Sequence, residues 1–437
     1  MYSLESKNLF NILNRHNLLS EESLSNLCRI AVEIINKELN TRTSAIFLFS
    51  KDGKLRRRAI AGLENGWLQE ECYDIGESII GKTVRPYSED SRYGEWRLYE
   101  DLEKDWGNNK YFHYYKERFG DIKRAICIPL NGPNRTFGVI RVIDKLDSKN
   151  LPVRFEENDA LLLTMLSHQI ATTISRIRRK AELDAISEVS KLLINRESSL
   201  QDIYDIVTNI FVREWTDYSA CILRIRDKDV LRLVSLSCDQ NVSCKFKDRS
   251  DRKIAEGYVG KVFDSGQPVT VKNILQYKSE FRDLNWIEQN GLISFGCFPI
   301  RTKKKIIGTL SLFAKFEFEF YPSQLTFIKN LSEQVVTATD IHHLIDTRDK
   351  ISEFVSDINS NIDRLDNVLQ MIVDSGMELT NADFGYIALT SKKNSLLIPQ
   401  KWTSNLQHNN IPSIDIDGEG LTAEAVRKGK IDQYWKC

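Results

Sequence analysis

The chain has 437 residues, which exceeds the roughly 250 to 300 residues at which a single core stops growing. Its 61 Lys and Arg residues balance 61 Asp and Glu residues, so we expect no nucleic-acid partner drawn by net charge. No apolar run reaches the roughly 18 to 20 residues of a membrane span, and the first residues lack signal-peptide character. We therefore expect a cytoplasmic protein without membrane contact.

The eight cysteines include no Cys-x-x-Cys pair. The nearest two, Cys238 and Cys244, have no pair of histidines beside them, so we expect no metal site. In a reducing compartment the cysteines are expected to be free thiols.

One pattern recurs three times along the chain in the same order. Residues 24–63, 200–236 and 365–402 each read as an amphipathic helix, an apolar strand, a polar turn and a second strand. A fixed order of elements at domain-sized spacing indicates duplicated modules. The third copy stops after its short helix, which predicts an incomplete module.

Each copy continues with a turn that contains glycine and opens a short helix. In the first copy, Gly76, Gly81, Lys82 and Thr83 satisfy the spacing of a phosphate-binding loop. Such a loop needs a buried parallel strand before it, and residues 69–74 are too polar to form one. We therefore expect a simple turn and helix start rather than a nucleotide site.

A second hairpin follows in the two complete copies, at 125–143 and 295–313. Cys127 and Cys297 occupy equivalent positions, where a small buried strand residue is favoured over a catalytic thiol. Pro129 and Pro299 are also equivalent, which predicts an edge strand or a bulge.

Long helices are expected to join the modules. In the second linker, apolar residues alternate spacings of three and four, which is typical of a coiled-coil seam; its central members are Ile351, Val355, Ile358, Ile362 and Leu365. The pattern favours a parallel homodimer. A helix packed on its own domain is the alternative.

These modules resemble GAF domains. The resemblance rests on the element order, the Gly-Glu turn before the short helix, the strands ending Cys-Ile-Pro and Cys-Phe-Pro, and the following Gly-Val-Ile and Gly-Thr-Leu strands. It implies an α+β fold of tandem domains, each a central antiparallel sheet with flanking helices, joined by long connecting helices. The expected segments are an N-terminal helical segment 1–23, domain 1 at 24–175, a helical linker 176–199, domain 2 at 200–340, a coiled-coil linker 341–364 and an incomplete domain 3 at 365–437.

Some GAF domains bind cyclic nucleotides through a motif that the first copy retains in part. Lys145, Phe155 and Asp159 match that motif, whereas Asp144 and Ala160 depart from it. The resemblance thus implies a possible cyclic-nucleotide site in the first module, braced by a Lys145–Asp159 ion pair. Covalent bilin attachment is not expected without a Cys-His dipeptide. A free methionine sulfoxide reductase would need pocket thiols such as Cys72 and Cys127.

An aromatic segment in the first module covers the place where the family holds its ligand. The candidate ligand-binding residues there are Tyr93, Trp96, Trp106, Tyr111, Phe112, His113, Arg124 and Cys127. Aromatic rings stack on planar ligands, while His113 and Arg124 can orient them. The alternative is that these rings form a satellite core beneath the insertion.

The sequence therefore predicts a non-catalytic sensory or regulatory protein. A small planar ligand or a partner would act on the first module, and the linker helices would pass the change to an output domain or to a partner that completes domain 3. The alternatives are a dimerisation scaffold without ligand and a cyclic-nucleotide-binding regulatory region.

Overall fold

The computed structural model describes residues 18–62, 71–84, 94–195, 198–244, 252–253, 257–303, 305–360, 364–380, 382–391, 395–402 and 411–428. The chain divides into two compact units, Met1–Ala338 and Thr339–Cys437. The first unit holds two modules and the second holds one, and the two units are described separately.

The first module is built on a seven-stranded antiparallel sheet. Its strands are β1 (Thr41–Phe49), β2 (Leu55–Ala61), β3 (Cys72–Tyr73), β4 (Arg97–Tyr99), β5 (Ala125–Asn131), β6 (Thr136–Leu146) and β7 (Pro152–Val153). They follow the order β3-β2-β1-β6-β5-β4, with β7 paired to β6. A register shift between Pro129 and Asn131 on β5 confirms the bulge that proline predicted there.

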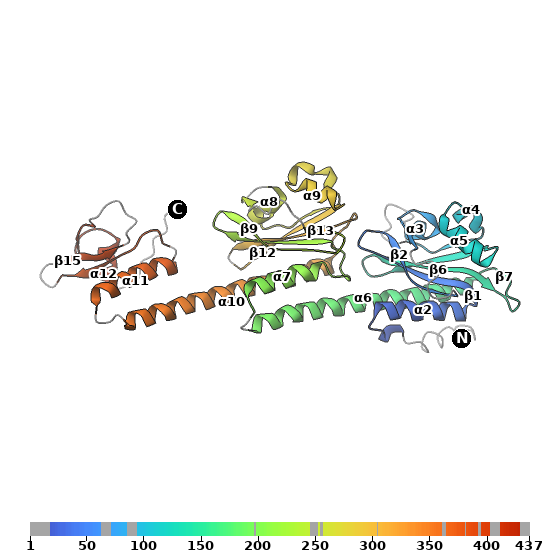
Figure 1. Ribbon diagram of the computed structural model, residues 1–437, viewed down its shortest axis with the longest axis horizontal. Coiled ribbons are helices and arrows are strands. Elements are labelled where there is room, and N and C mark those ends of the chain that lie inside the picture. Colours follow the sequence, from blue (N-terminus) through green and yellow to red (C-terminus); the bar gives the residue numbers. More distant parts are fainter. Residues whose placement is uncertain are drawn as a thin grey trace. The chain divides into compact units, whose positions relative to one another are not determined.

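Helices cover both faces of this sheet (Figure 1). The helices on one face are α2 (Leu24–Glu38) and α6 (Glu157–Ile194), and those on the other are α3 (Ser78–Val84), α4 (Leu102–Trp106) and α5 (Lys110–Phe119). The Ser23 side chain accepts a hydrogen bond from the backbone N–H of Asn26 and so caps α2. Asn109 caps α5 in the same way, through the N–H of Tyr111.

The second module repeats this arrangement. Its elements are α7 (Leu200–Phe211), β8 (Ala220–Asp227), β9 (Val230–Cys238), β10 (Arg252–Lys253), α8 (Gly257–Ser265), β11 (Val269–Val271), the 3₁₀ turns η2 (Ile274–Gln276) and η3 (Lys278–Glu280), α9 (Leu284–Gln289), β12 (Ser294–Arg301), β13 (Ile306–Ala314) and α10 (Pro322–Ser360). The strand order β10-β9-β8-β13-β12-β11 matches that of the first module position by position. The predicted duplication and the predicted fold class are both confirmed.

A single helix contributes to the cores of both modules. Ile170 and Ile174 on α6 are buried in the core between the first sheet and the helices α2 and α6. Ala185 and Val189, further along α6, are buried in the corresponding core of the second module. The helix α6 runs unbroken for 38 residues, so it includes both the end of predicted domain 1 and most of the predicted helical linker 176–199.

Polar contacts join the two modules within the unit Met1–Ala338. Arg135 on the β5–β6 turn lies 2.9 Å from the carboxylate of Asp217, whose side chain is about one-tenth exposed. Gln324 of α10 donates to the same carboxylate over 3.1 Å. Lys51 of the β1–β2 turn donates to the backbone carbonyls of Val212 and Tyr218. The segment just before β8 is therefore held from both modules.

The unit Thr339–Cys437 contains the third copy. Besides the last part of α10 it has α11 (Leu365–Thr380), β14 (Tyr386–Thr390), β15 (Leu396–Trp402), β16 (Ile414–Asp415) and α12 (Leu421–Lys428). The strand order is β14-β15-β16. The predicted helix, hairpin and short helix of this copy are confirmed. The predicted domain boundaries stay predictions.

Candidate ligand cavity in the second module

The aromatic segment of the first module packs into a core of its own. Trp106, Tyr111, Phe112 and Tyr115 are all buried, and they join side chains of β1, α3, β5 and β6 in one cluster. Cys127 on β5 belongs to the same cluster and is fully buried. The predicted ligand residues Trp106, Tyr111, Phe112 and Cys127 therefore belong to one buried cluster, as the satellite-core alternative expects.

A buried ion pair lies at the centre of this core. Arg141 of β6 is fully buried, and its guanidinium lies 2.5 Å from the carboxylate of Glu71, which is buried too. Tyr73 and Tyr115 donate to Glu71 over 2.6 and 3.0 Å. The Arg141 guanidinium also lies about 5 Å from the rings of Phe47, Trp106 and Tyr115.

The network keeps Arg141 charged. Burial by itself lowers the pKa of a guanidinium, but the Glu71 carboxylate outweighs burial and raises the pKa of Arg141 above its ordinary value. The guanidinium is thus neutralised and surrounded by the module's own groups. Arg141 and Glu71 were not among the residues predicted from the sequence, although an arginine inside the apolar run of residues 137–143 is a signal of buried charge.

The other predicted ligand residues lie outside this core. Trp96 is 52% exposed, and His113 is exposed on α5. Arg124 lies 2.7 Å from Glu100, and its side chain is one-fifth exposed. Tyr93 lies outside the described residues. Of the seven predicted residues that the structure describes, four are buried in this core and three lie outside it.

The four residues of the partial cyclic-nucleotide motif contact other groups of the first module. Asp144 is buried and accepts from the backbone N–H groups of Lys123 and Arg124. Phe155 belongs to the core between the sheet and the helices α2 and α6. Lys145 lies 2.9 Å from Asp159, as predicted, and Asp159 also caps the start of α6. These residues connect β6 with α6, and Phe155 is not part of the core formed under α3 to α5.

The second module contains a cavity of about 280 Å³ under α8, η3 and α9. Its aromatic lining is Tyr258, Phe281, Phe295 and Phe313. Arg224 of β8 and Ser311 of β13 form part of its wall, and Arg224 is only 2% exposed. Glu280 also lines the cavity and is held 2.9 Å from Lys261.

Strand register relates this cavity to the core of the first module. Gly138 on β6 and Gly308 on β13 are equivalent. Each is the first residue of its strand to pair with the neighbouring central strand, Gly138 with Leu48 on β1 and Gly308 with Ile225 on β8. Counting from these glycines, Ser311 stands where the first module has Arg141. Arg224, which pairs with Thr309, stands where the first module has Phe47, which pairs with Val139. Each module thus carries one buried arginine on this face, but on a different central strand.

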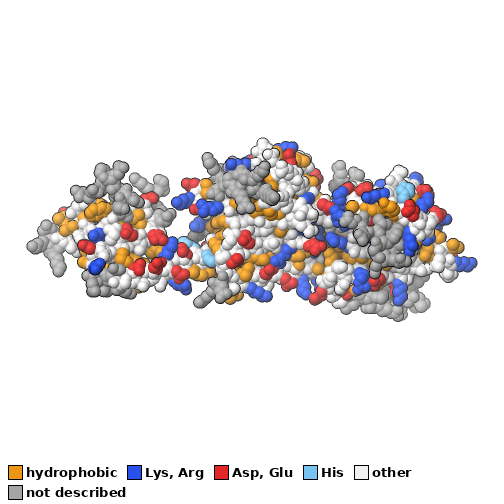
Figure 2. Space-filling model, in the orientation of Figure 1, with side chains coloured by type: hydrophobic (Ala, Val, Ile, Leu, Met, Phe, Trp, Pro, Cys, Tyr) orange, Lys and Arg blue, Asp and Glu red, His pale blue; other side chains and the backbone are white. Residues whose placement is uncertain are grey.

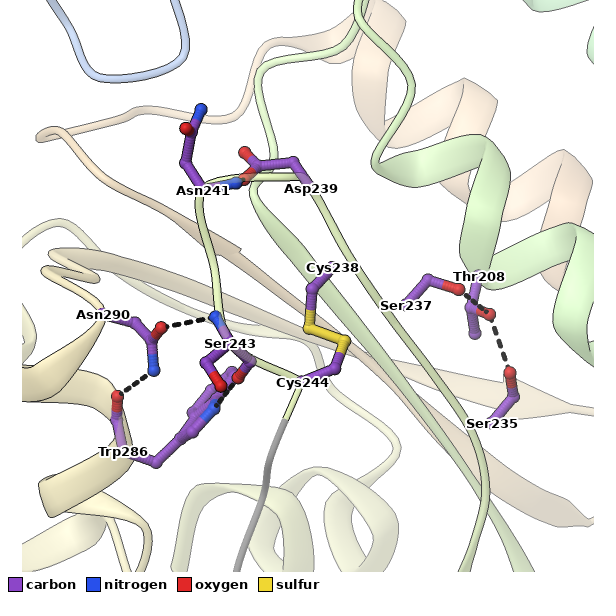
Figure 3. The surroundings of a disulfide bond; sticks show 10 residues. All are labelled: Thr208, Ser235, Ser237, Cys238, Asp239, Asn241, Ser243, Cys244, Trp286 and Asn290. Atoms are coloured by element: carbon purple, nitrogen blue, oxygen red, sulfur yellow. Dashed lines mark hydrogen bonds between the residues drawn. A yellow bond between two sulfur atoms is a disulfide. The ribbon is translucent and has the colours of Figure 1, made fainter.

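A disulfide lies beside α9, which roofs the cavity. Cys238 at the end of β9 is bonded to Cys244 (Figure 3). Between them, Ser243 donates its N–H to Asn290 over 2.7 Å, and the Trp286 indole donates to the Ser243 carbonyl over 2.8 Å. The prediction of free thiols throughout is therefore wrong for this pair, because the tight loop after β9 brings the two side chains together.

The strand cysteines are buried and chemically quiet. Burial raises the pKa of Cys127 to about 12, and that of Cys297 to about 12 as well. Cys72 lies on β3, four strands away from Cys127 on β5, which corresponds to about 19 Å across the sheet. Cys72 and Cys127 therefore do not form the cluster of thiols that a methionine sulfoxide reductase would need.

The turn at Gly76 is not a phosphate-binding loop. The strand before it, β3, pairs antiparallel with β2 at the end of the sheet, and α3 has only seven residues. The prediction of a simple turn and helix start is confirmed. Among the described residues there is no group of three metal-ligating side chains, and no helix there is long and apolar enough to span a membrane.

Comparison with known proteins places this architecture in a family. Residues 197–340 match the family model described as GAF domain. No curated protein matches the chain. The GAF domain of a phosphoenolpyruvate-protein phosphotransferase from Acinetobacter is 19% identical, with 37% of this chain and 93% of that chain covered and a TM-score of 0.31.

Two further solved structures are similar. The free methionine-R-sulfoxide reductase of Neisseria meningitidis, in complex with its substrate, is 13% identical and covers 38% of this chain and 89% of its own, with a TM-score of 0.31. A bacteriophytochrome from R. palustris is 10% identical and covers 77% of this chain and 76% of its own, with a TM-score of 0.43. The family match over residues 197–340 identifies the second module as a GAF domain, a sensory, ligand-binding regulatory module found in signalling proteins, and the first module repeats its strand order.

Proposed function

We propose that this protein is a non-catalytic regulator whose second GAF domain binds a small anionic ligand that carries an apolar, planar part. The observation that carries the proposal is the cavity of about 280 Å³ with the buried Arg224 in its wall. The sequence pointed to the first domain. The packing favours the second, because in the first domain the equivalent face is filled by Arg141, Glu71 and aromatic rings.

The lining defines the chemistry of the ligand. A guanidinium in a poorly solvated wall favours a carboxylate or phosphate, which it can bind through paired charge-assisted hydrogen bonds. The four aromatic side chains around it favour a flat apolar group. The volume of about 280 Å³ lies just below the usual range for ligand pockets, which runs from about 300 to 1,000 Å³, so a small metabolite fits better than a dinucleotide.

Transmission would use the helix that follows the cavity. Ser311 and Phe313 of β13 line the cavity, and the chain after β13 leads into α10, which continues to Ser360. A ligand that favours one packing of β13 and α10 over another would bias that helix. The signal therefore requires different ligand affinities for the two arrangements.

Ligand binding is tested on the full-length protein by thermal shift and calorimetry. The probes are small aromatic carboxylates and aromatic monophosphates, and native mass spectrometry of the purified protein reports any ligand that co-purifies. We expect Arg224→Gln to weaken the best probe at least about tenfold, because it removes the charge that pairs with the anion. The matched control is Arg226→Gln, two residues along the same strand and exposed, with an expected change below about twofold. Equal affinities for both variants would refute the proposal.

The helix α10 is proposed to dimerise with a second copy of itself. Ile351 and Val355 are 45% and 49% exposed, and Leu365 on α11 is 65% exposed. Ile358 is half-buried, and Ile362 lies outside the described residues. The spacing of four and three residues between Ile351, Val355 and Ile358 on α10 supports a coiled-coil partner of the same sequence, whereas Leu365 begins a separate helix.

Light scattering after size exclusion tests the dimer. Ile351→Lys with Val355→Lys is expected to give a monomer. Ser356→Lys with Ser360→Lys adds the same charge to exposed positions off the stripe and is expected to leave the dimer intact. A monomeric wild type, or dimers in both variants, would contradict the seam.

A further inference from the structure

Each of the first two modules has a hollow beside its C-terminal helix, and in the second module this hollow is separate from the ligand cavity. It lies where β5 or β12 meets the C-terminal helix of the domain. In the first domain it measures about 840 Å³ and includes Pro129 and Ser167 in its lining. In the second it measures about 970 Å³ and includes Pro299 and Ser332. Ser167 and Ser332 are equivalent, since each follows Phe155 or Phe320 by twelve residues.

The two hollows have opposite charge. In the first domain the charged lining is Arg97 against Glu95 and Asp105, a net of −1 apart from His168. In the second it is Arg301, Lys303, Lys305 and Lys329 against Glu333, which gives four minus one, or +3. Since the whole chain is neutral and Figure 2 shows both signs interspersed on the face in view, this local excess is not a general property of the surface.

The floor of the second hollow is apolar. It includes Phe298, Pro299, Ile306, Leu325 and Ile328, and Leu325 is 39% exposed. Arg301, Lys303 and Lys305 have no acidic partner among the residues that the structure describes, and Lys329 lies 3.9 Å from Glu333. We name this hollow, with its apolar floor and basic rim, the basic groove.

We propose that the basic groove binds an acidic segment of a partner protein that carries apolar side chains. The rim matches carboxylates in sign, and the floor accepts aliphatic side chains that water would otherwise contact. Nucleic acid fits less well, because single strands stack their bases on exposed aromatic rings, whereas the only aromatic ring of the lining, Phe298, is 6% exposed. The first domain, with the same hollow and the opposite charge, would not take this partner.

The proposal is tested by fluorescence anisotropy on the full-length protein. The probe is a labelled synthetic peptide in which Glu and Leu alternate at helical spacing. One comparison peptide replaces Leu by Ser, and another replaces Glu by Lys. We expect the Glu/Leu peptide to bind, and Arg301→Glu with Lys305→Glu to weaken it at least about tenfold.

The matched control reverses two charges of the same domain outside the groove. Lys272→Glu with Lys278→Glu is expected to change the affinity less than about twofold, since both lysines are exposed. Leu325→Ser should weaken the Glu/Leu peptide about threefold without affecting the Ser peptide, because only the apolar contact is removed. Circular dichroism verifies that each variant is folded.

Three results would overturn the proposal. They are failure of the Glu/Leu peptide to bind, equal losses in the groove and control variants, and displacement of the peptide by a single-stranded oligonucleotide that binds more tightly. Arg224→Gln is expected to leave peptide binding unchanged, so the outcome here is independent of the ligand proposal for the cavity.

Discussion

The first module and the second, which is the GAF domain, share one strand order and differ in how they bury an arginine. In the first, Arg141 on β6 pairs with Glu71 and lies about 5 Å from the rings of Phe47, Trp106 and Tyr115, all within one buried core. In the second, the equivalent of Arg141 is Ser311, and Arg224 on the neighbouring strand faces a cavity. The buried arginine thus stands on β6 in the first module and on β8 in the second, where a serine occupies the position equivalent to Arg141 and a cavity lies beside it. Duplication allows this, because one copy can keep the structural role while the other changes.

The largest expected effect is on the filled core. Glu71→Gln leaves Arg141 buried without a countercharge, which should cost about 3–5 kcal/mol of the free energy of unfolding of the first domain. Urea titration followed by hydrogen exchange of β1 and β6 measures it separately from the second domain. Glu103→Gln, at an exposed pair with Lys116, is the control and should cost less than about 1 kcal/mol. A small loss at Glu71 would mean that the pair is dispensable.

The next effect concerns whether the two cores are independent. The Asp217 carboxylate accepts hydrogen bonds from Arg135 of the first module and from Gln324 of the second. Asp217→Asn weakens both contacts and should therefore lower the free energy of unfolding by about 2 kcal/mol. Burial raises the pKa of Asp217, but Arg135 and Arg178 outweigh it, so the pKa lies below the ordinary value.

This lowered pKa fixes the sign of the pH dependence. A carboxyl with a depressed pKa stabilises the fold above its unfolded pKa and loses that contribution as the pH falls through the folded pKa. Wild type should therefore lose stability in acid by more than Asp217→Asn does, as thermal unfolding at several pH values would reveal. Parallel acid curves for the two proteins would exclude this role.

A smaller effect is expected from filling the cavity. Ser311→Leu adds apolar volume where the second domain is hollow, and should raise stability by about 0.5–2 kcal/mol while abolishing ligand binding. The thermal midpoint and the calorimetric affinity measure the two effects. A destabilised variant that still bound ligand would show that Ser311 does not face the site.

The smallest effect should be seen at the strand thiols. With the pKa of Cys127 and of Cys297 raised to about 12, neither thiol forms appreciable thiolate near neutral pH. Iodoacetamide at pH 8 should label the half-buried Cys72 well before either of them, and both should react only on unfolding. Mass spectrometry of peptides from the labelled protein follows each site, and early labelling of Cys127 would reopen the thiol-enzyme alternative.

The repeat order was readable from sequence because helix, strand and turn patterns are local. The position of the site was not, because it depends on which side chains from distant strands share one space. Arg141 and Arg224 both interrupt apolar strands, and this signal identifies buried charge without revealing its partner. Glu71, 70 residues before Arg141, becomes its partner only through the sheet order. The aromatic segment suggested a pocket equally well as a core, and among its described residues Trp106, Tyr111 and Phe112 pack into a core.

The unbroken helix α6 also constrains how this protein can evolve. Because each residue turns an α-helix by about 100°, one inserted residue between Ile177 and Ala185 would rotate Val189 away from its core while Ile174 stayed in place. Insertions of about seven residues, close to two full turns, would restore the angular phase. Natural variation in the spacing between these two domains should therefore come in steps of whole turns rather than single residues.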